Sequence, residues 1–399
     1  MSKEFDVYVG HGPCIDGQTS LAIAWSTLHP DVQAYLAKFG GFYAENKGAP
    51  VADEDAHPDA PHALKPEMAL KIMQGWDLKD HEPKVFVTCH PSTPLPVDLI
   101  KGKRVLLMDL DPGTATLKQL REHTKNTFLI DHHASFRSSV SGLEAKVVEC
   151  ETTALADNLS YYWDPRKQSS GASLTWTYFN PDVKIPTLIE MVQIGDTWSW
   201  KQNPELKVRE CMAALYRTGT FTSFPAIMDL VKNLDKSYET LVTTGRISLD
   251  LERSHIVELA SKADLGVITS VVGDVKTNYN ILYTSTPLFA NSVCVEMRTQ
   301  KAAQWAKQGV EIHFCANWKY KVKEGIVTVS LRSNLPGLRL GEIARGIPGV
   351  KSGGGHDAAA AFIFEGIHNF HTFIQKPAIT VVAAVVDATT AVVAEQKAA

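Results

Sequence analysis

Thr127-Phe128-Leu129-Ile130-Asp131-His132-His133 joins a short apolar run to a carboxylate and two imidazoles. The apolar part is typical of a buried strand in a parallel sheet, and open α/β sheets bind their ligands beyond the carboxyl ends of the strands. Imidazole and carboxylate together suit a divalent transition metal. The triplet alone is weak evidence, because three residues recur by chance and a polar strand end with a capping Asp is the simpler interpretation.

Other ionisable residues follow apolar segments in the same way. The segments are two strand-like runs at residues 5–9 and 105–108 and a helical pattern at residues 188–195. Any one of the residues behind them is more often a cap or a turn residue, but their recurrence favours a metal site built from carboxylates and imidazoles. With Asp131 and His132 of the triplet included, the residues concerned are His11, Asp16, Asp109, Asp131, His132 and Asp196.

Residues 1–205 alternate between strand and helix patterns. Parallel strands need helical crossovers, so this alternation predicts an α/β fold with a parallel, Rossmann-like sheet. Strands are expected near residues 5–10, 84–89, 104–109 and 127–131, and helices near 19–28, 64–76 and 114–124.

Residues 206–264 have helical spacing, which predicts a helical linker. Residues 265–375 switch to strand-like runs with one helix near 293–307, which predicts a smaller α/β domain. The strand-like runs lie at 266–268, 279–283, 310–314 and 326–331. Residues 376–399 form a tail rich in Ala and Val, which is interrupted by Asp387 and short for a bilayer span. We expect a surface helix or a loose tail there, and no membrane partner.

Taken together, these motifs resemble those of the DHH phosphoesterases, a family named for the Asp-His-His triplet. Residues 14–20, Cys14-Ile15-Asp16-Gly17-Gln18-Thr19-Ser20, are similar to its first motif, usually Asp-x-Asp-Gly-x-Thr-Ser. Asp109 resembles the second-motif acid, the triplet is the third motif, and Gly195-Asp196 resembles the fourth. Residues 352–362, with Gly353-Gly354-Gly355-His356, are similar to the signature of the DHH-associated C-terminal domain. The resemblance covers most of the chain, with both signatures in the right order.

The resemblance implies two Mn²⁺ ions that share Asp109. One complete metal site would consist of Asp16, Asp109, His132 and Asp196, and the other of His11, Cys14 and the shared Asp109. Cys14 departs from the pattern, because the family has an acid there. A thiolate is softer than a carboxylate and favours Zn²⁺ or Fe over Mn²⁺, with Mg²⁺ as another possible ion, so this second site would be altered, weaker or filled only when substrate phosphate adds a ligand. A small buried apolar Cys14 is an equally good interpretation.

For function, the resemblance implies a metal-dependent phosphoesterase with its active site in the cleft between the two domains. Asp131 and His133 would be catalytic, with His133 contacting the phosphate under attack. Successive glycines and a nearby Arg can bind phosphate. The expected substrate is a short oligonucleotide or a dinucleotide, cleaved at a phosphodiester bond. The residues that would hold its adjacent nucleotide are Arg332, Ser333, Gly353, Gly354, Gly355 and His356.

Two alternatives remain open at this stage. One is a phosphomonoesterase or pyrophosphohydrolase that acts on a small nucleotide. The other is a non-catalytic nucleotide-binding protein with a degraded metal site, which the replacement at Cys14 permits.

Composition agrees with a globular enzyme of two domains, because the 399 residues are 44% hydrophobic and 21% charged. A net charge of −4 argues against wrapping of long duplex nucleic acid. The six cysteines show no paired spacing, which predicts a reducing compartment. No apolar leader precedes the first strand, so we expect a cytoplasmic protein. Oligomeric state and the choice between RNA and DNA are open.

Overall fold

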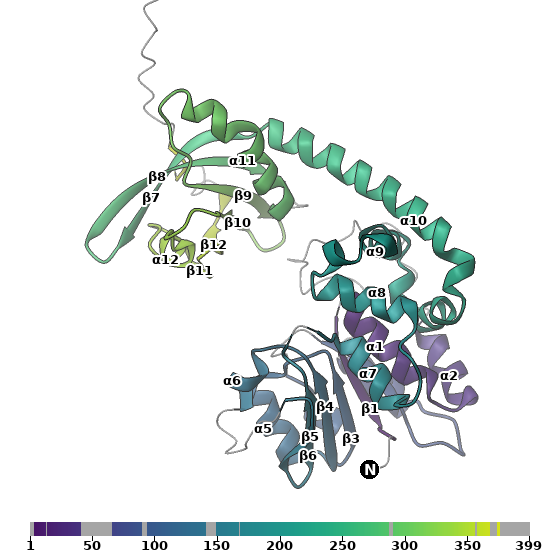
Figure 1. The fold of residues 1–399 in the computed structure, drawn as a ribbon. Helices are drawn as coiled ribbons and strands as arrows, with labels where there is room; N and C mark the ends of the chain where they lie inside the picture. The colour runs from purple at the N-terminus through teal and green to yellow at the C-terminus, as the bar shows by residue number, and fades with distance from the viewer. Residues whose placement is uncertain are drawn as a thin grey trace, which may run out of the picture. The chain divides into compact units, whose positions relative to one another are not determined.

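The computed structural model describes residues 4–12, 14–40, 66–89, 94–140, 149–166, 168–286, 290–355, 357–367 and 373–375. The chain forms two compact units, Met1–Leu251 and Glu252–Ala399, and each is described here by itself. The division falls inside the long helix α10 (Phe224–Ser261), within the segment expected to connect two domains (Figure 1). The expected boundaries near residues 205 and 264, and a cleft between the domains, stay predictions.

The first unit is built on a six-stranded sheet with the strand order β2-β1-β3-β4-β6-β5. All neighbours pair in parallel except β5, which is antiparallel to β6 at the edge. The predicted strands are confirmed, and β5 and β6 are additional. The strands are β1 (Val7–His11), β2 (Val85–Cys89), β3 (Arg104–Met108), β4 (Asn126–Asp131), β5 (Thr152–Ala156) and β6 (Leu159–Trp163).

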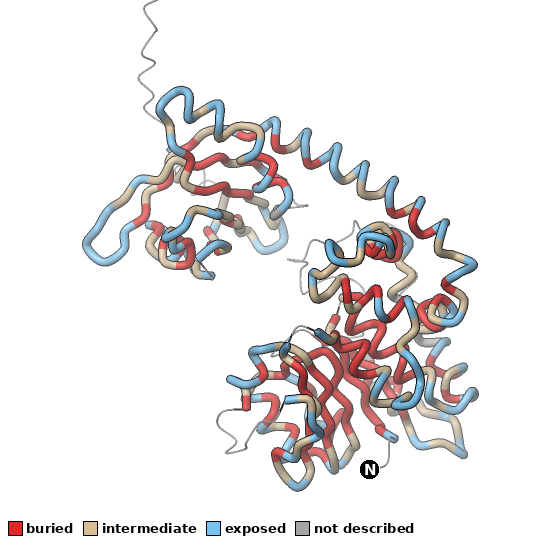
Figure 2. The backbone as a smooth tube through the Cα atoms, viewed as in Figure 1, coloured by how far each residue is buried: buried red, intermediate tan, exposed pale blue. Residues whose placement is uncertain are grey.

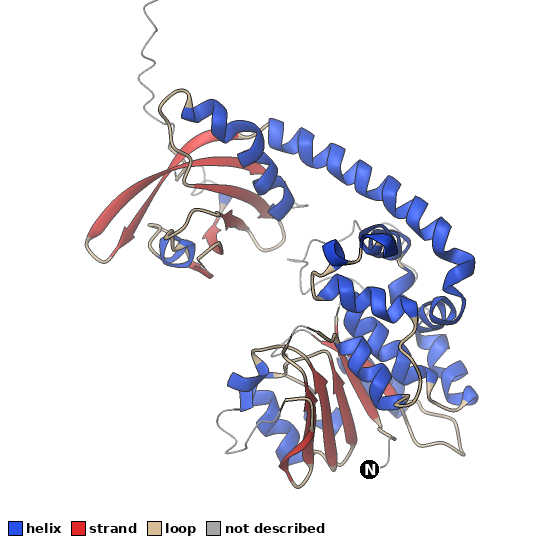
Figure 3. Ribbon diagram, in the orientation of Figure 1, coloured by secondary structure: helices blue, strands red, loops and turns tan. Residues whose placement is uncertain are grey.

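Helices lie on both faces of this sheet, with α5 and α6 on one face and α1 and α7 on the other (Figures 1 and 3). This arrangement explains why the central strands are apolar throughout, since both of their faces are covered. Helix α1 begins at Ile15, which is earlier than expected, so Asp16 lies in its first turn and not in a long glycine-rich turn. The helices are α1 (Ile15–Ser26), α2 (Pro30–Gly40), α3 (Pro66–Gln74), α4 (Val97–Ile100), α5 (Gly113–His123), α6 (Phe136–Val140), α7 (Gly171–Phe179), α8 (Thr187–Asp196) and α9 (Val208–Thr218).

The second unit has a mixed sheet with the strand order β11-β12-β10-β9-β8-β7, in which only β8 and β9 pair in parallel. The prediction of a smaller α/β domain is therefore confirmed. Its elements are β7 (Asp264–Val272), β8 (Val275–Ser285), α11 (Ala290–Ala306), β9 (Phe314–Lys321), β10 (Ile326–Arg332), α12 (Leu340–Arg345), β11 (Ser352–Gly355) and β12 (Ala359–Glu365).

The expected strand at residues 310–314 is wrong, because β9 begins only at Phe314. The preceding segment is tied to β8 by three separate hydrogen bonds with Asn280 instead of a ladder, one of them from the Asn280 side-chain amide to the Glu311 carbonyl at 3.1 Å. The His313 N–H donates to the Asn280 carbonyl at 2.9 Å, and the Asn280 N–H donates to the His313 ring at 3.1 Å.

The glycine-rich loop expected at Gly353–Gly355 is also wrong, because these residues belong to the edge strand β11 and pair with β12. A Cβ atom on Gly353 would lie 2.4 Å from the carbonyl oxygen of Ala344 in α12. Gly355 also has a packing reason, because its φ is +138° and a Cβ atom on it would lie 2.5 Å from the Ala360 Cα. Gly354 is different, because its nearest neighbour would be the Arg345 guanidinium at 3.7 Å.

Buried residues concentrate in the strands of each sheet and in the helix faces that cover them (Figure 2). Among the described residues, no helix is both long enough and apolar enough to cross a lipid bilayer. The Ala- and Val-rich tail lies outside the described residues. The cellular compartment stays a prediction.

Candidate metal centre

Three adjacent strands deliver the predicted ligands to one edge of the first sheet. β1, β3 and β4 are neighbours, and their carboxyl ends carry His11, Asp109 and the Asp131–His133 triplet. The start of α1 adds two more residues and the end of α8 adds Asp196. Ligand atoms lie within 4.8 Å of one another in three overlapping groups: Asp109, Asp131, His132 and His133; His11, Cys14 and Asp109; and Asp16, His132 and Asp196.

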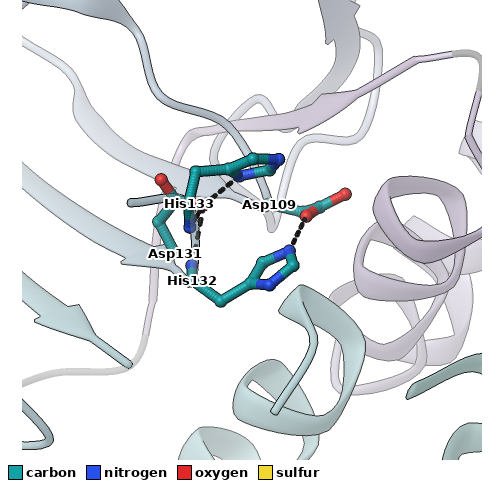
Figure 4. Close-up of side chains that lie close together, drawn as sticks. All are labelled: Asp109, Asp131, His132 and His133. Carbon is teal, nitrogen blue, oxygen red and sulfur yellow. Dashed lines mark hydrogen bonds and ion pairs between the residues drawn. The ribbon is translucent and has the colours of Figure 1, made fainter. Parts of the chain in front are cut away.

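Asp109 stands at the centre of these groups. Its Oδ1 lies 3.1 Å from His132 Nε2, a contact that Figure 4 marks with a dashed line. Its Oδ2 accepts a hydrogen bond from the Cys14 thiol at 3.3 Å and lies 3.8 Å from His11 Nδ1. The two oxygens of one carboxylate therefore face two different sets of ligands, which is the arrangement expected of an acid shared between two cations.

The backbone at Asp109 is unusual, because its φ is +55° and the residue is buried. Gly171, the first residue of α7, lies against it so closely that a Cβ atom there would be 2.3 Å from Asp109 Cβ. Glycine at this position is thus required for the helix to approach the site.

The N-terminus of α7 binds a second carboxylate, that of Asp16. The backbone N–H groups of Gly171 and Ala172 donate to the two oxygens of Asp16 at 2.7 and 2.8 Å. Free N–H groups and the positive end of the helix dipole stabilise a carboxylate at such a position. Ser170 caps α7, and the sequence gives no signal that the start of this helix binds Asp16.

Three carboxylates, those of Asp16, Asp109 and Asp196, are crowded together in this cluster. Burial raises the pKa of Asp109, but hydrogen bonds from His11 and His132 outweigh it and hold that pKa well below its usual range. Burial and then the Asp109 charge raise the pKa values of Asp16 and Asp196. Crowded carboxylates beside imidazoles are relieved by a bound divalent cation, so the donor set fits a metal such as Mn²⁺.

Asp131 holds His133 in place. Its Oδ1 accepts the backbone N–H groups of His132 at 2.9 Å and of His133 at 3.3 Å, and it lies 2.7 Å from His133 Nδ1. Burial lowers the pKa of His133, but the hydrogen bond and the charge of Asp131, together with the charge of Asp109, outweigh burial and raise that pKa to about 9. With Nδ1 engaged, Nε2 is the ring nitrogen left for a ligand, and the His133 side chain is 37% exposed. Asp131 Oδ2 is buried without a hydrogen-bond partner among the described residues.

Cys14 has two roles in the structure. It is the N-cap of α1, where its sulfur accepts the Gly17 N–H at 3.2 Å, and it also lies 3.3 Å from His11 Nδ1. Burial and the neighbouring charges of Asp109 and Asp16 raise the pKa of the thiol. When no cation is bound, the sulfur therefore carries its proton. Cys14 lies in one ligand group with His11 and Asp109, so it is placed to bind a cation as well as to cap α1.

Two substitutions of Cys14 separate these roles. Cys14→Asp should tighten Mn²⁺ binding, by about tenfold if the harder ligand adds ~1.4 kcal/mol, and Cys14→Ser should weaken it. Asp and Ser are both good N-caps, so α1 should persist in either variant. Without metal, Cys14→Asp should lower the unfolding temperature, because it adds a carboxylate beside Asp109 and Asp16.

The measurement is a Mn²⁺ titration followed by thermal unfolding. Cys89→Ala is the matched control, since Cys89 is buried beside His11 in the β1–β2 register but belongs to no ligand group of the described chain. If both Cys14 variants titrate like the parent, Cys14 is only a structural cap.

The residues expected to bind substrate lie in the second unit. Arg332 ends β10, and its guanidinium donates to the Leu331 carbonyl at 2.8 Å. The Ser333 hydroxyl holds a turn, because it donates to the His313 carbonyl at 2.8 Å and accepts the Leu335 N–H at 3.2 Å. His356 lies outside the described residues. A substrate-binding role for this group, including Gly353–Gly355, stays a prediction.

Comparison with known proteins gives weak likenesses. No family model matches the chain. An uncharacterised protein, R106 of Acanthamoeba polyphaga mimivirus, is 24% identical over 199 residues, and the match spans 50% of this chain but only 34% of that protein. Among solved structures, the pGpG-specific phosphodiesterase PggH of Vibrio cholerae has a TM-score of 0.40 and 13% identity, with coverage of 92% of this chain and 95% of that one. RecJ of Thermus thermophilus, in complex with Mn²⁺, has a TM-score of 0.38 and 16% identity, with coverage of 92% and 51%.

A further similar structure is an exopolyphosphatase-related protein of Bacteroides fragilis, with a TM-score of 0.32, 12% identity and coverage of 90% and 87%. Likenesses of this size decide nothing about activity. The assignment therefore depends on the site itself.

Proposed function

We propose that this chain is a metal-dependent phosphoesterase of the DHH family, which hydrolyses phosphodiester bonds in short oligonucleotides or dinucleotides. The observation that carries the proposal is the position of Asp109, whose two oxygens face two sets of carboxylate, imidazole and thiol ligands. Asp109 belongs to the second of the four sequence motifs that resemble the family's, and it contacts the first through Cys14 and the third through His132.

The proposed ligands divide into two sets. Asp16, Asp109, His132 and Asp196 would hold one Mn²⁺ ion, and His11, Cys14 and Asp109 a second cation, for which Mg²⁺, Zn²⁺ or Fe are alternatives. Bound cations of this kind supply hydroxide at neutral pH and neutralise the phosphoryl oxygens.

His133 would contact the substrate directly, and Asp131 would act through His133. The hydrogen bond and the charge of Asp131 favour the charged form of the His133 ring, in which Nε2–H can donate to an oxygen of the phosphate under attack. The Asp131 carboxylate fixes the ring through Nδ1 and balances its charge. This pair contributes a preorganised donor where negative charge develops.

The proposed substrate class follows from charge and from the second unit. A net charge of −4 is poor for holding long duplexes, whereas a local cationic residue suffices for a short chain. Arg332, Ser333 and the segment Gly353–His356 are the proposed contacts for the adjacent nucleotide. Within that segment, Gly354 is the glycine with room for a ligand, because the other two described glycines are explained by packing.

The experiment that tests the function is a Mn²⁺-dependent product profile on end-labelled oligomers of two to about twenty nucleotides. Turnover that is fastest on the shortest oligomers supports the proposal. Release of inorganic phosphate from a mononucleotide would favour a phosphomonoesterase, and cleavage of a pyrophosphate linkage a pyrophosphohydrolase. Nucleotide binding without turnover would favour a non-catalytic protein with a degraded site at Cys14.

Arg332→Ala tests the contact with the far nucleotide. A charge-assisted contact of about 1.5–3 kcal/mol should be lost, so KM for a dinucleotide should rise about 10- to 150-fold. KM for bis(p-nitrophenyl) phosphate should change far less, because that ester has no second nucleotide.

Arg339→Ala is the control for this test, since Arg339 is in the same unit, is exposed and pairs with Glu342 at 2.9 Å. Its kinetics should match the parent's. Equal losses on both substrates in Arg332→Ala would place Arg332 at the metal centre or in the fold, and the argument for a nucleotide substrate would lose its main support.

A further inference from the structure

Helix α8 ends immediately behind Asp196 in a Schellman motif. The Ser199 N–H donates to the Ile194 carbonyl at 3.0 Å, and the Trp198 N–H donates to the Gly195 carbonyl at 3.3 Å. In this motif the residue after the helix cap adopts a left-handed backbone and is usually glycine. Here the cap is Thr197 and the next residue is Trp198, with a φ of +57°.

Tryptophan at this position is unfavourable for the fold. A bulky residue at positive φ is strained, and such strain persists mainly where it serves a function. Burial does not compensate for it, because Trp198 is 63% exposed. The ring contacts the half-buried Trp200, with 4.7 Å between ring centroids and an angle of 48° between the planes.

The position of Trp198 connects this ring to the metal centre. Two peptide units separate it from Asp196, so their Cα atoms lie within about 7 Å. Asp196 Oδ2 in turn lies 3.5 Å from His132 Nε2. The exposed indole therefore belongs to a residue two positions from a proposed metal ligand, within the same unit.

We propose that Trp198, supported by Trp200, is a stacking site for the nucleobase next to the scissile phosphate. This inference rests on the proposed function. It adds that the base of the substrate, rather than its phosphate or sugar, contacts Trp198. An aromatic face stacks on every base, so the site would select nucleotides over simple phosphate esters without reading sequence.

The direct test compares two ligands that differ only in the base. With Mn²⁺ present, calorimetry should show that the parent binds AMP about 5- to 150-fold more tightly than ribose 5-phosphate, the range expected for one stacked base. Trp198→Ala should lose most of that ratio, with ribose 5-phosphate affinity unchanged. Trp198→Phe should keep part of it.

The kinetic counterpart uses a dinucleotide and the same compound with an abasic residue on one side. Trp198→Ala should raise KM for the intact dinucleotide over the same range and leave KM for the matching abasic compound unchanged. If the parent cleaves neither compound, the proposed function fails, whereas the AMP to ribose 5-phosphate ratio still decides the stacking site.

A third variant separates stacking from fold. Trp198→Gly should unfold at the parent's temperature or above, because glycine relieves the positive φ, while its preference for AMP is lost. Lys207→Gly is the matched control, since Lys207 is an exposed residue with a φ of +47° and no ring, and it should keep the parent's preference. The inference is overturned if the parent does not prefer AMP, if Trp198→Ala keeps the preference, or if Trp198→Gly is clearly destabilised.

Discussion

Asp109→Asn is expected to lower kcat at least ~10³-fold, which exceeds the ~100-fold loss typical of a residue that only supports a metal ligand. The reason is that Asp109 faces both ligand sets, so one substitution weakens both cation sites. Mn²⁺ should raise the unfolding temperature of the parent by mass action and should raise that of the variant much less.

Asn is the informative replacement at this position. The residue is buried at a φ of +55°, where Asn is tolerated far better than Ala. Asn also keeps the volume against which Gly171 packs. A loss of metal response in Asp109→Asn can therefore be assigned to the missing charge and not to a collapsed strand end.

The matched control is Asp111→Asn. Asp111 is also buried just beyond β3, but its oxygens accept the Gly113 N–H at 3.0 Å and the Ser139 hydroxyl at 3.0 Å, and it belongs to no ligand group of the described chain. This variant should keep the metal response and the turnover of the parent. Full activity in Asp109→Asn would refute the metal assignment.

Burial of a carboxylate does not by itself mark the site. At the opposite end of the first sheet, Asp6 is buried as well, but Arg104 and Lys84 contact it at 2.7 and 3.2 Å. Burial raises the pKa of Asp6, and these cations outweigh that effect and lower it. Asp6 is therefore neutralised by the fold, whereas Asp16 and Asp196 are left with raised pKa values and a place for a cation.

The sequence predicts a strand correctly where that strand is a single continuous apolar run. The strands that end at Asp109 and Asp131 are continuous hydrophobic runs, and a parallel sheet brings their carboxyl ends together. Strand β5 was missed because most of its residues are at least partly exposed, so it shows no apolar run. The strand at Gly353–Gly355 was missed because glycine has low strand propensity, and only the close contact with α12 explains it.

Contacts between residues far apart in the chain could not be predicted from the sequence. Cys14 meets Asp109 across 95 positions, and Asp16 meets the N-terminus of α7 across 155. Spacing along the chain carries no record of such pairs. The sequence gives no sign of the unusual backbone at Trp198 either, because a positive φ at a non-glycine residue is visible only in the folded chain.

The partnership of Asp131 and His133 predicts a non-additive loss. His133→Ala should lower kcat about 10²–10³-fold, as expected when one preorganised donor is removed. Asp131→Asn keeps an oxygen for the two backbone N–H groups but loses the charge that orients the ring, so a loss of about 10- to 100-fold is expected. The double variant should be no worse than His133→Ala, because Asp131 then has no ring to position.

This double-mutant cycle also decides between two roles of Asp131. The carboxylate lies in one ligand group with Asp109 and His132, and its Oδ2 has no partner among the described residues, so it could serve as a ligand itself. In that case the double variant should lose more than His133→Ala alone and approach the product of the two losses, about 10³–10⁵-fold, because Asp131 would then have a role apart from the ring. Coupled losses with an unchanged Mn²⁺ titration of Asp131→Asn would instead show that Asp131 acts through His133, which is the role that the 2.7 Å contact with Nδ1 predicts.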